Sequence, residues 1–232
     1  MSSAEQAIRL KFLSSVPLLQ DLSTATIQDI SRQMGVIACS RGDRIFTEGS
    51  EAATFYLIWE GWVKVMRDTA SGHSVLFEIL GPGEMLGAVA VVNEHPFPAT
   101  AVAASEGKLL TLSGKSFTGY LNRYPEMQRN YSREIGTRLG QTRAWQTSIS
   151  LNVEGRIAQL FLRLAERMGK REGASVRLPR LLTRQEIADM VGTTLETAIR
   201  TVSRWNKEGL VRTEEHSFVI EALDDLVALS EK

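Results

Sequence analysis

Glu196 and Arg200 are the residues whose types and spacing are best suited to recognising another molecule. They stand four positions apart in a segment with helical periodicity, so both side chains lie on one face of a helix. The planar fork of an arginine pairs with O6 and N7 of guanine, and a glutamate accepts a hydrogen bond from N4 of cytosine. We therefore predict that Glu196 and Arg200 read base edges of double-stranded DNA.

Residues suited to phosphate or secondary DNA contacts surround this pair: Arg184, Gln185, Thr194, Thr197 and Arg204. The whole chain has 27 basic and 27 acidic residues, but residues 151–213 hold twelve Lys and Arg against seven Asp and Glu. A local basic surplus is typical of a DNA-binding segment. The alternative is that Glu196 and Arg200 form a solvated, helix-stabilising ion pair worth only about a few tenths of a kcal/mol.

Two short helices must hold this face in place. Thr183 with Glu186, and Thr193 with Glu196, have the spacing of capping boxes. Gly192 suits the turn between the helices, and the second helix is expected from about residue 194 to 208. The expected buried positions are Ile187 and Val191 in the first helix and Leu195, Ile199 and Val202 in the second. A hairpin over residues 210–220 and a last helix from near Ala222 complete a winged helix-turn-helix.

The first part of the chain has a different pattern. Residues 1–35 are predicted to form short helices, one of them following Ser23. From residue 36 to 112, short β-rich runs alternate with glycines, and AVAVV at 88–92 is one of the runs assigned to strands. A hairpin turn is expected at residues 70–72. This texture predicts an antiparallel β-roll, so the fold class of the whole chain is α+β.

A long helix is predicted from about residue 125 to 147. One stripe along it carries Met127, Tyr131, Ile135, Leu139, Thr142 and Trp145. The stripe either packs on the roll of its own chain or pairs with the same helix of a second chain, and its last five members are the candidate dimer interface. Residues 148–153 are interpreted as a hinge, 155–169 as a helix and 169–173 as a loop. The expected domains are 1–124, 125–150 and 151–232.

Composition disfavours several classes of function. There is no run of 18 apolar residues and no apolar signal core, so we expect a cytoplasmic protein without a membrane span. Cys39 is the single cysteine and is expected to be inert. His73, His95 and His216 are scattered, so no metal site is predicted. No catalytic motif stands in a usable context, and the protein is not expected to be an enzyme.

The order of these parts resembles the cyclic AMP receptor protein/FNR (Crp/Fnr) superfamily of bacterial transcription regulators. The resemblance rests on RGDRIFTEGSEAATFYLIWEGWVKV, GPGEMLG, VEGRIAQLFLRLAER and the helix-turn-helix. It implies a homodimer on a palindromic operator, with RNA polymerase as a further partner and Glu196 and Arg200 at the base-reading positions. A half-site with a TGA-like core follows. Ile199 stands where the FNR branch has a serine, which argues against a full FNR-type half-site.

The resemblance also implies an effector site between the roll and the long helix. Its candidate residues are Met85, Leu86, Ala88, Pro98, Ala99, Thr100, Ile135 and Thr142. Ala88 stands where cyclic AMP binders have a glutamate, and Pro98 and Ala99 replace their Arg-Ser pair, so no cyclic AMP binding is predicted. The segment PFPATA resembles nitric-oxide-responsive branches, some of which bind haem. A haem-based nitric oxide sensor and a constitutive regulator controlled by its abundance stay as alternatives.

Overall fold

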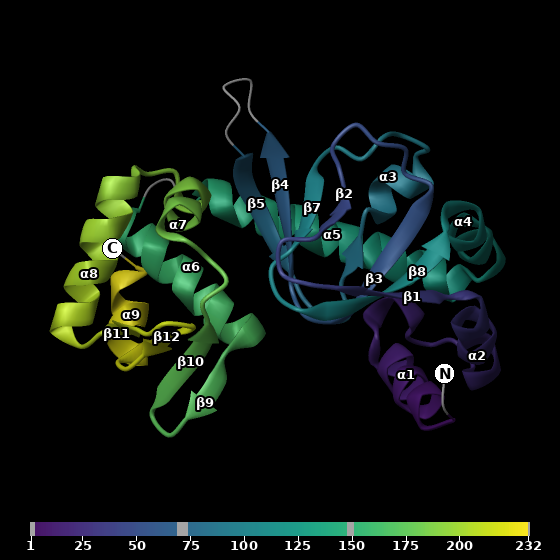
Figure 1. Ribbon diagram of the computed structural model, residues 1–232, viewed down its shortest axis with the longest axis horizontal. Coiled ribbons are helices and arrows are strands. Elements are labelled where there is room, and N and C mark those ends of the chain that lie inside the picture. Colours follow the sequence, from purple (N-terminus) through teal and green to yellow (C-terminus); the bar gives the residue numbers. More distant parts are fainter. Residues whose placement is uncertain (1–2, 69–73, 148–150, 232) are drawn as a thin grey trace. The chain divides into compact units, whose positions relative to one another are not determined.

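The computed structural model describes residues 3–68, 74–147 and 151–231, and the side chains of residues 5–67, 74–140 and 151–231. The chain divides into two compact units, residues 1–141 and 142–232. The first unit holds the N-terminal helices and two antiparallel sheets, and the second holds helices with one sheet (Figure 1). The expected α+β architecture is confirmed.

The sheets of the first unit form a roll. One sheet has the strand order β1-β8-β3-β6 and the other has β2-β7-β4-β5. The strands are β1 (Gly35–Cys39), β2 (Arg44–Phe46), β3 (Thr54–Glu60), β4 (Val63–Asp68), β5 (Ser74–Leu80), β6 (Met85–Leu86), β7 (Thr100–Ala103) and β8 (Gly107–Ser113). The turn expected at residues 70–72 lies outside the described residues, although β4 and β5 do pair as antiparallel neighbours.

Helices pack against one face of the first sheet. They are α1 (Ser3–Ser15), the 3-10 turn η1 (Pro17–Leu19), α2 (Thr24–Gln33), α4 (Gly114–Arg123) and α5 (Pro125–Thr147). Neighbouring residues of β3 and β8 serve different cores: Leu57 and Leu110 pack with these helices, whereas Ile58 and Leu109 pack with the second sheet. Because successive side chains point to opposite faces of a strand, both strands are buried on both sides.

Residues 88–92 are helical, so the strand assigned to AVAVV was wrong. They form α3 (Ala88–Val92), which follows β6 directly. Gly87 supplies the reason, because its φ of +75° places the chain in the left-handed region that favours glycine. A Cβ atom at this position would lie 2.5 Å from the ring of Phe97, so the turn into α3 also requires a residue without a side chain.

The second unit contains the helix-turn-helix. Its helices are α6 (Val153–Met168), α7 (Arg184–Val191), α8 (Leu195–Glu208) and α9 (Leu223–Leu229). Its sheet has the strand order β11-β12-β10-β9, with β9 (Lys170–Glu172), β10 (Ser175–Pro179), β11 (Val211–Thr213) and β12 (Ser217–Ile220). The pairing of β11 with β12 confirms the predicted hairpin wing.

The charged stretch at residues 169–173 was predicted to be a loop, and that prediction was wrong. Residues 170–172 form the edge strand β9, which pairs with β10. All three residues are exposed, so no alternation of buried and exposed side chains marks the strand in the sequence. Charged side chains on a short edge strand also discourage pairing with other chains. The predicted hinge falls partly on residues 148–150, which lie outside the described residues.

Candidate nucleic-acid interface and ligand pocket

The turn between α7 and α8 is built from capped helix ends. Thr183 and Glu186 exchange side-chain to backbone hydrogen bonds, which confirms the first capping box. Gly192 ends α7 with φ +65°, a conformation that suits glycine. The predicted second capping box of Thr193 with Glu196 was wrong, because the N-cap is Thr194 and the residue three positions later is Thr197 rather than a glutamate. Its hydroxyl accepts a hydrogen bond from the backbone amide of Thr197 over 3.2 Å.

Arg156 of α6 fixes this turn, a role that sequence reasoning missed. Its Nε donates to the Val191 carbonyl over 2.8 Å, and its Nη1 donates to the Leu151 carbonyl over 2.9 Å. The last carbonyls of a helix lack partners within the helix and carry partial negative charge. The guanidinium therefore satisfies the end of α7 at the point where the chain turns toward α8.

The buried side of α8 is centred on Trp205. Its ring meets Phe161 of α6 edge to face, with ring centroids 5.8 Å apart, and its Nε1 donates to the Glu154 carboxylate over 2.8 Å. The prediction that Leu195 and Ile199 are buried was wrong, because both side chains are exposed. Their spacing of four residues is helical, but the buried stripe runs beside them through Ala198, Thr201, Val202 and Trp205.

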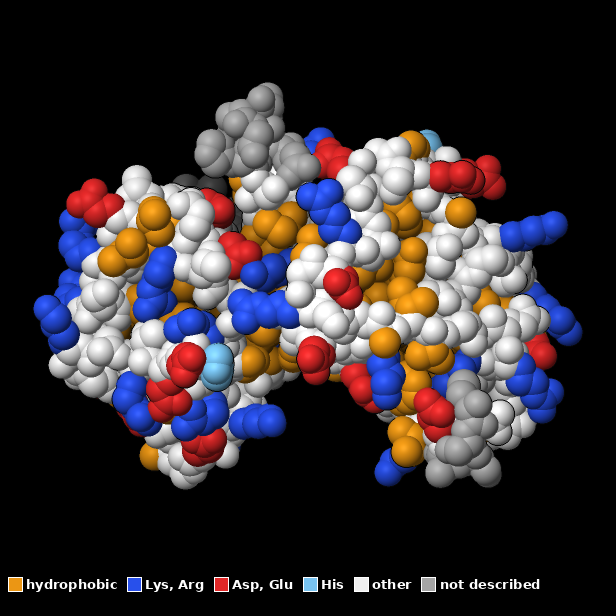
Figure 2. All heavy atoms as spheres, in the orientation of Figure 1, with side chains coloured by type: hydrophobic (Ala, Val, Ile, Leu, Met, Phe, Trp, Pro, Cys, Tyr) orange, Lys and Arg blue, Asp and Glu red, His pale blue; other side chains and the backbone are white. Residues whose placement is uncertain are grey.

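Glu196 and Arg200 lie on the exposed side of the same helix. Neither side chain forms a hydrogen bond or ion pair with another described residue. Figure 2 shows basic side chains along the outer edge of the region that Figure 1 labels α8. A capped helix that is held by an aromatic core on one side thus presents charged, unpaired side chains on the other. This is the geometry that a helix needs to enter a major groove.

Of the other predicted DNA contacts, Arg204 and Arg184 are engaged within the protein. The Nη2 of Arg204 lies 2.5 Å from Oε1 of Glu154. Arg184 donates from Nη2 to the Thr213 hydroxyl over 3.0 Å, and its guanidinium lies 5.0 Å from the ring centroid of Phe218. Burial lowers the pKa of Arg184, and the nearby Arg180 lowers it further. Arg184 therefore joins α7 to the wing in this unit.

The predicted contacts with uncharged side chains lie at the helix starts. Gln185 is exposed and donates to the Asp189 carboxylate over 2.7 Å. The hydroxyls of Thr194 and Thr197 are 2.9 Å apart at the first turn of α8. The N-terminus of a helix carries partial positive charge and free amides, so this position favours a phosphate group.

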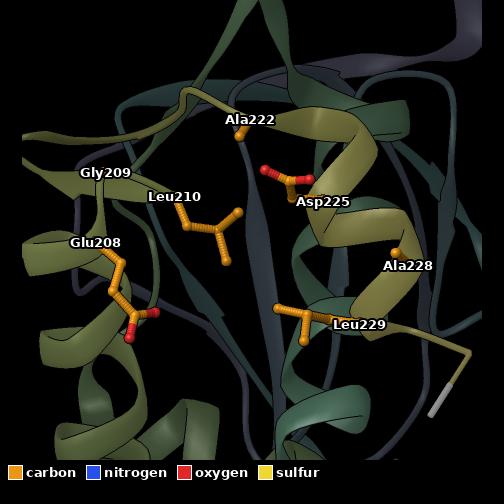
Figure 3. A pocket seen from close by; sticks show the side chains of 7 residues that line it. All are labelled: Glu208, Gly209, Leu210, Ala222, Asp225, Ala228 and Leu229. Carbon is orange, nitrogen blue, oxygen red and sulfur yellow. The ribbon is translucent and has the colours of Figure 1, made fainter.

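A hollow of about 300 Å³ opens between the end of α8 and α9. Figure 3 shows Glu208 and Asp225 on opposite walls, with the side chains of Leu210 and Leu229 pointing toward one another. Two carboxylates repel the phosphate backbone, so this hollow does not belong to a DNA-binding face.

The first unit contains a smaller pocket of about 150 Å³. Six predicted effector residues line it: Met85, Leu86, Ala88, Pro98, Ala99 and Ile135. Thr100 does not line it, because this buried residue instead accepts a hydrogen bond from the Glu48 amide over 3.0 Å. The side chain of Thr142 lies outside the described residues. Sequence reasoning missed further lining residues, among them Phe46, Glu78, Phe97 and Arg138.

Aromatic and aliphatic groups dominate the walls of this pocket. Phe46 and Phe97 stack with ring centroids 3.7 Å apart. Arg138 of α5 donates to the Met85 carbonyl over 2.9 Å, so this lining cation is already bound to the backbone. On the same helix, burial raises the pKa of Glu134, and the proximity of Arg138 opposes that rise. Arg138 is the one basic side chain among the described residues that line the pocket, and Glu78 is the one acidic side chain.

The predicted dimer stripe on α5 has two parts. Met127 is buried, and Tyr131 and Ile135 pack against the core of their own unit, as the first of the two alternatives expected. Leu139 is different, because 62% of its side chain is exposed. The side chains of Thr142 and Trp145 lie outside the described residues. The stripe therefore leaves the core of the first unit near Leu139.

Metal binding, thiol reactivity and membrane insertion are the other candidate properties of the described part of the chain. Among those residues no cluster of three or more His, Cys, Asp or Glu is placed to hold a metal ion. Burial and the nearby Asp43 raise the pKa of the Cys39 thiol, so it is a weak nucleophile. None of the helices of the described segments is long and apolar enough to cross a bilayer.

Comparisons with known proteins agree with this arrangement. Residues 36–124 match the family Cyclic nucleotide-binding domain, and residues 155–229 match the family Crp-like helix-turn-helix domain. The CRP-like cAMP-activated global transcriptional regulator of Mycobacterium tuberculosis is 28% identical over 211 residues, which are 90% of this chain and 94% of the relative. The chain belongs to the Crp/Fnr superfamily. It is a transcription regulator with a helix-turn-helix DNA-binding domain, and not an enzyme.

A second relative and a solved structure show a similar likeness over most of the chain. The nitrogen fixation regulation protein FixK of Bradyrhizobium diazoefficiens is 24% identical over 191 residues, which are 82% of this chain and 79% of the relative. The structure of FixK2 from Bradyrhizobium japonicum has a TM-score of 0.73 at 17% identity and covers 84% of this chain and 96% of that one. At this identity the structural likeness shows the shared Crp/Fnr fold alone.

Proposed function

We propose that the protein acts as a homodimer that binds an inverted-repeat operator through α8 and responds to an effector other than cyclic AMP. The observation that carries this proposal is the exposed, unpaired pair Glu196 and Arg200 on a helix locked in place through Trp205. Both side chains have the chemistry of G·C recognition. A half-site with a TGA-like core fits such a pair, and RNA polymerase is proposed as a further partner.

Selection of genomic fragments that bind the purified protein tests this proposal. Two copies of α8 in a symmetric dimer contact major grooves about 34 Å apart, so the recovered sequences should share an inverted repeat with half-sites one helical turn apart. A matched selection with Glu196→Ala/Arg200→Ala should lose the shared repeat, because phosphate contacts alone carry little sequence information. Recovery of unrelated sequences by the unaltered protein would refute the proposal.

The pocket of the first unit is proposed as the effector site. Ala88, Pro98 and Ala99 contribute no charge to its lining, and Arg138 already binds a backbone carbonyl. A phosphate buried there would have Arg138 as its one cationic partner among the described lining residues, in a lining that also holds the Glu78 carboxylate, so its burial is costly. Most of the side chains that line this pocket of about 150 Å³ are apolar, which suits an uncharged ligand. These properties support an effector different from the cyclic AMP named for the mycobacterial relative.

Calorimetric titration with cyclic AMP tests the effector proposal, with a cyclic-AMP-activated relative as the positive control. No heat of binding and no change in operator affinity are expected. Saturable binding of cyclic AMP that strengthens operator binding would contradict the proposal. Operator binding at full affinity with no added small molecule would instead favour a constitutive regulator controlled by its abundance.

The described residues give a haem group no histidine ligand at this pocket. Axial ligation uses a histidine, cysteine, tyrosine or methionine side chain, and Met85 is the one described lining residue of these types. His95 is exposed and is not among the lining residues, and His73 lies outside the described residues. A haem-based sensor is therefore not the function that the pocket favours.

A further inference from the structure

Two apolar side chains stand exposed on the helix that is proposed to enter the major groove. Leu195 is 41% exposed and Ile199 is 43% exposed, although both carry large aliphatic groups. The buried side of α8 is complete without them, since Ala198, Val202 and Trp205 contact the core. Single exposed hydrophobic residues are common on protein surfaces, so their position has to decide what they do.

Their position places them next to the proposed base-reading pair. Leu195 directly precedes Glu196, and Ile199 directly precedes Arg200. Residues of an α-helix are rotated by about 100° from one to the next, so the apolar pair forms a row beside the charged pair. The row runs parallel to the helix axis over one turn. A major groove that admits Glu196 and Arg200 therefore brings the apolar row against the neighbouring base edges.

One base carries an apolar group at the floor of the major groove. The C5 methyl of thymine is exposed there, and aliphatic side chains recognise it by direct contact. We propose that Leu195 and Ile199 contact thymine methyl groups and so determine a preference for T·A pairs beside the positions read by Glu196 and Arg200. This inference rests on the proposed function, because it requires α8 to lie in the major groove.

The size of the expected effect is set by the burial of one methyl group. Removing one such contact corresponds to about a fourfold loss of affinity. Loss of a bidentate arginine contact to guanine costs far more. The apolar row should therefore refine the half-site rather than define it.

Replacing thymine with deoxyuridine tests the inference on the unaltered protein. Deoxyuridine pairs like thymine and lacks only the methyl group, so each thymine of the selected operator is replaced in turn. Fluorescence anisotropy should show about fourfold weaker binding at one or two positions per half-site and no change elsewhere. If no single replacement changes the affinity, the inference is wrong.

Side-chain variants assign each methyl group to its residue. In Ile199→Ala the difference between thymine and deoxyuridine should vanish at one position and persist at the other, and Leu195→Ala should give the reverse. Val227→Ala is the matched control, because Val227 is 41% exposed on α9 and should leave every difference intact. Differences that persist in both Ile199→Ala and Leu195→Ala would overturn the assignment.

Failure of the proposed function has a separate signature. In that case the unaltered protein binds the thymine-containing operator no better than a scrambled duplex, and the inference fails with it. Tight, specific binding that ignores deoxyuridine overturns only the role of Leu195 and Ile199.

Discussion

Arg200 carries the largest share of the expected sequence specificity at the level of single residues. Its guanidinium is unpaired within the described part of the protein, whereas Arg184 and Arg204 already have partners. A free guanidinium can bind guanine without first breaking a contact in the protein. The two engaged arginines are better suited to hold the domain together and to lie near phosphates.

Substitution of Arg200 should therefore affect specificity as well as affinity. Arg200→Ala should cost about 1–3 kcal/mol on the selected operator and relax the preference at one base pair. Arg204→Ala is the comparison: if its side chain touches phosphate, all sequences should weaken alike and the salt dependence should become shallower by about one ion. Anisotropy titrations over several salt concentrations distinguish the two. Identical behaviour of both variants would show that Arg200 does not read bases.

The thiol of Cys39 should react slowly in the folded protein. Burial comes first among the causes that raise its pKa, followed by the charge of Asp43. A raised pKa leaves less thiolate at a given pH, so alkylation at pH 8 should be slower in the native state than in denaturant, and should accelerate as the pH rises toward 10. Mass spectrometry of iodoacetamide-treated samples measures both rates. Equal rates in the native and denatured states would contradict this account of the thiol.

Individual elements show which features the sequence could and could not predict. The capping box of Thr183, the wing and the long helix were predictable because they depend on local patterns. The helix at residues 88–92 was not, since AVAVV has strand-like composition and its conformation depends on the contact of Gly87 with Phe97. The exposure of Ile199 was also not predicted, because helical periodicity does not say which of two adjacent stripes on α8 is buried with Trp205. The packing of Trp205 against Phe161 of α6 determines which stripe is buried.

The N-cap of α8 offers a direct test at the level of the element. Thr194→Ala should lower the free energy of unfolding by about 1 kcal/mol, because the amide of Thr197 loses its acceptor. Thr193→Ala is the matched control one residue earlier and should change it by less than about half as much. Urea denaturation followed by circular dichroism measures both. A larger loss in Thr193→Ala would mean that the helix begins one residue earlier.

The exposed end of the α5 stripe should matter for assembly. Leu139→Asp places a charge where a second chain is proposed to pack, so the dimer should dissociate at micromolar concentration. Gln128→Asp puts the same charge at an exposed position of the same helix outside the stripe and should leave the dimer intact. Light scattering after size-exclusion chromatography reports the mass. A dimer that survives Leu139→Asp would show that this part of α5 is not the interface.

At the level of the whole molecule, the two units divide the work of a regulator. The first encloses a pocket walled by Phe46 and Phe97, and the second presents the reading face of α8. The basic surplus is local to part of the second unit: residues 151–213 carry twelve Lys and Arg against seven Asp and Glu, whereas the charged residues of 214–232 are mostly acidic. Both the family and this division were predictable from sequence. Pocket residues such as Arg138 could not be predicted, because the pocket is lined by residues that are far apart in the sequence and meet only in the folded unit.

The most direct test of the central claim is a change of spacing within the operator. Binding is measured on the selected inverted repeat, on one half-site alone and on a repeat lengthened at its centre by about 5 base pairs, which is half a helical turn. We predict tight binding to the intact repeat and a large loss of affinity on both altered duplexes, because two copies of α8 cannot then reach both major grooves from one side. Equal affinity for all three duplexes would contradict the account of a dimer that reads DNA through Glu196 and Arg200.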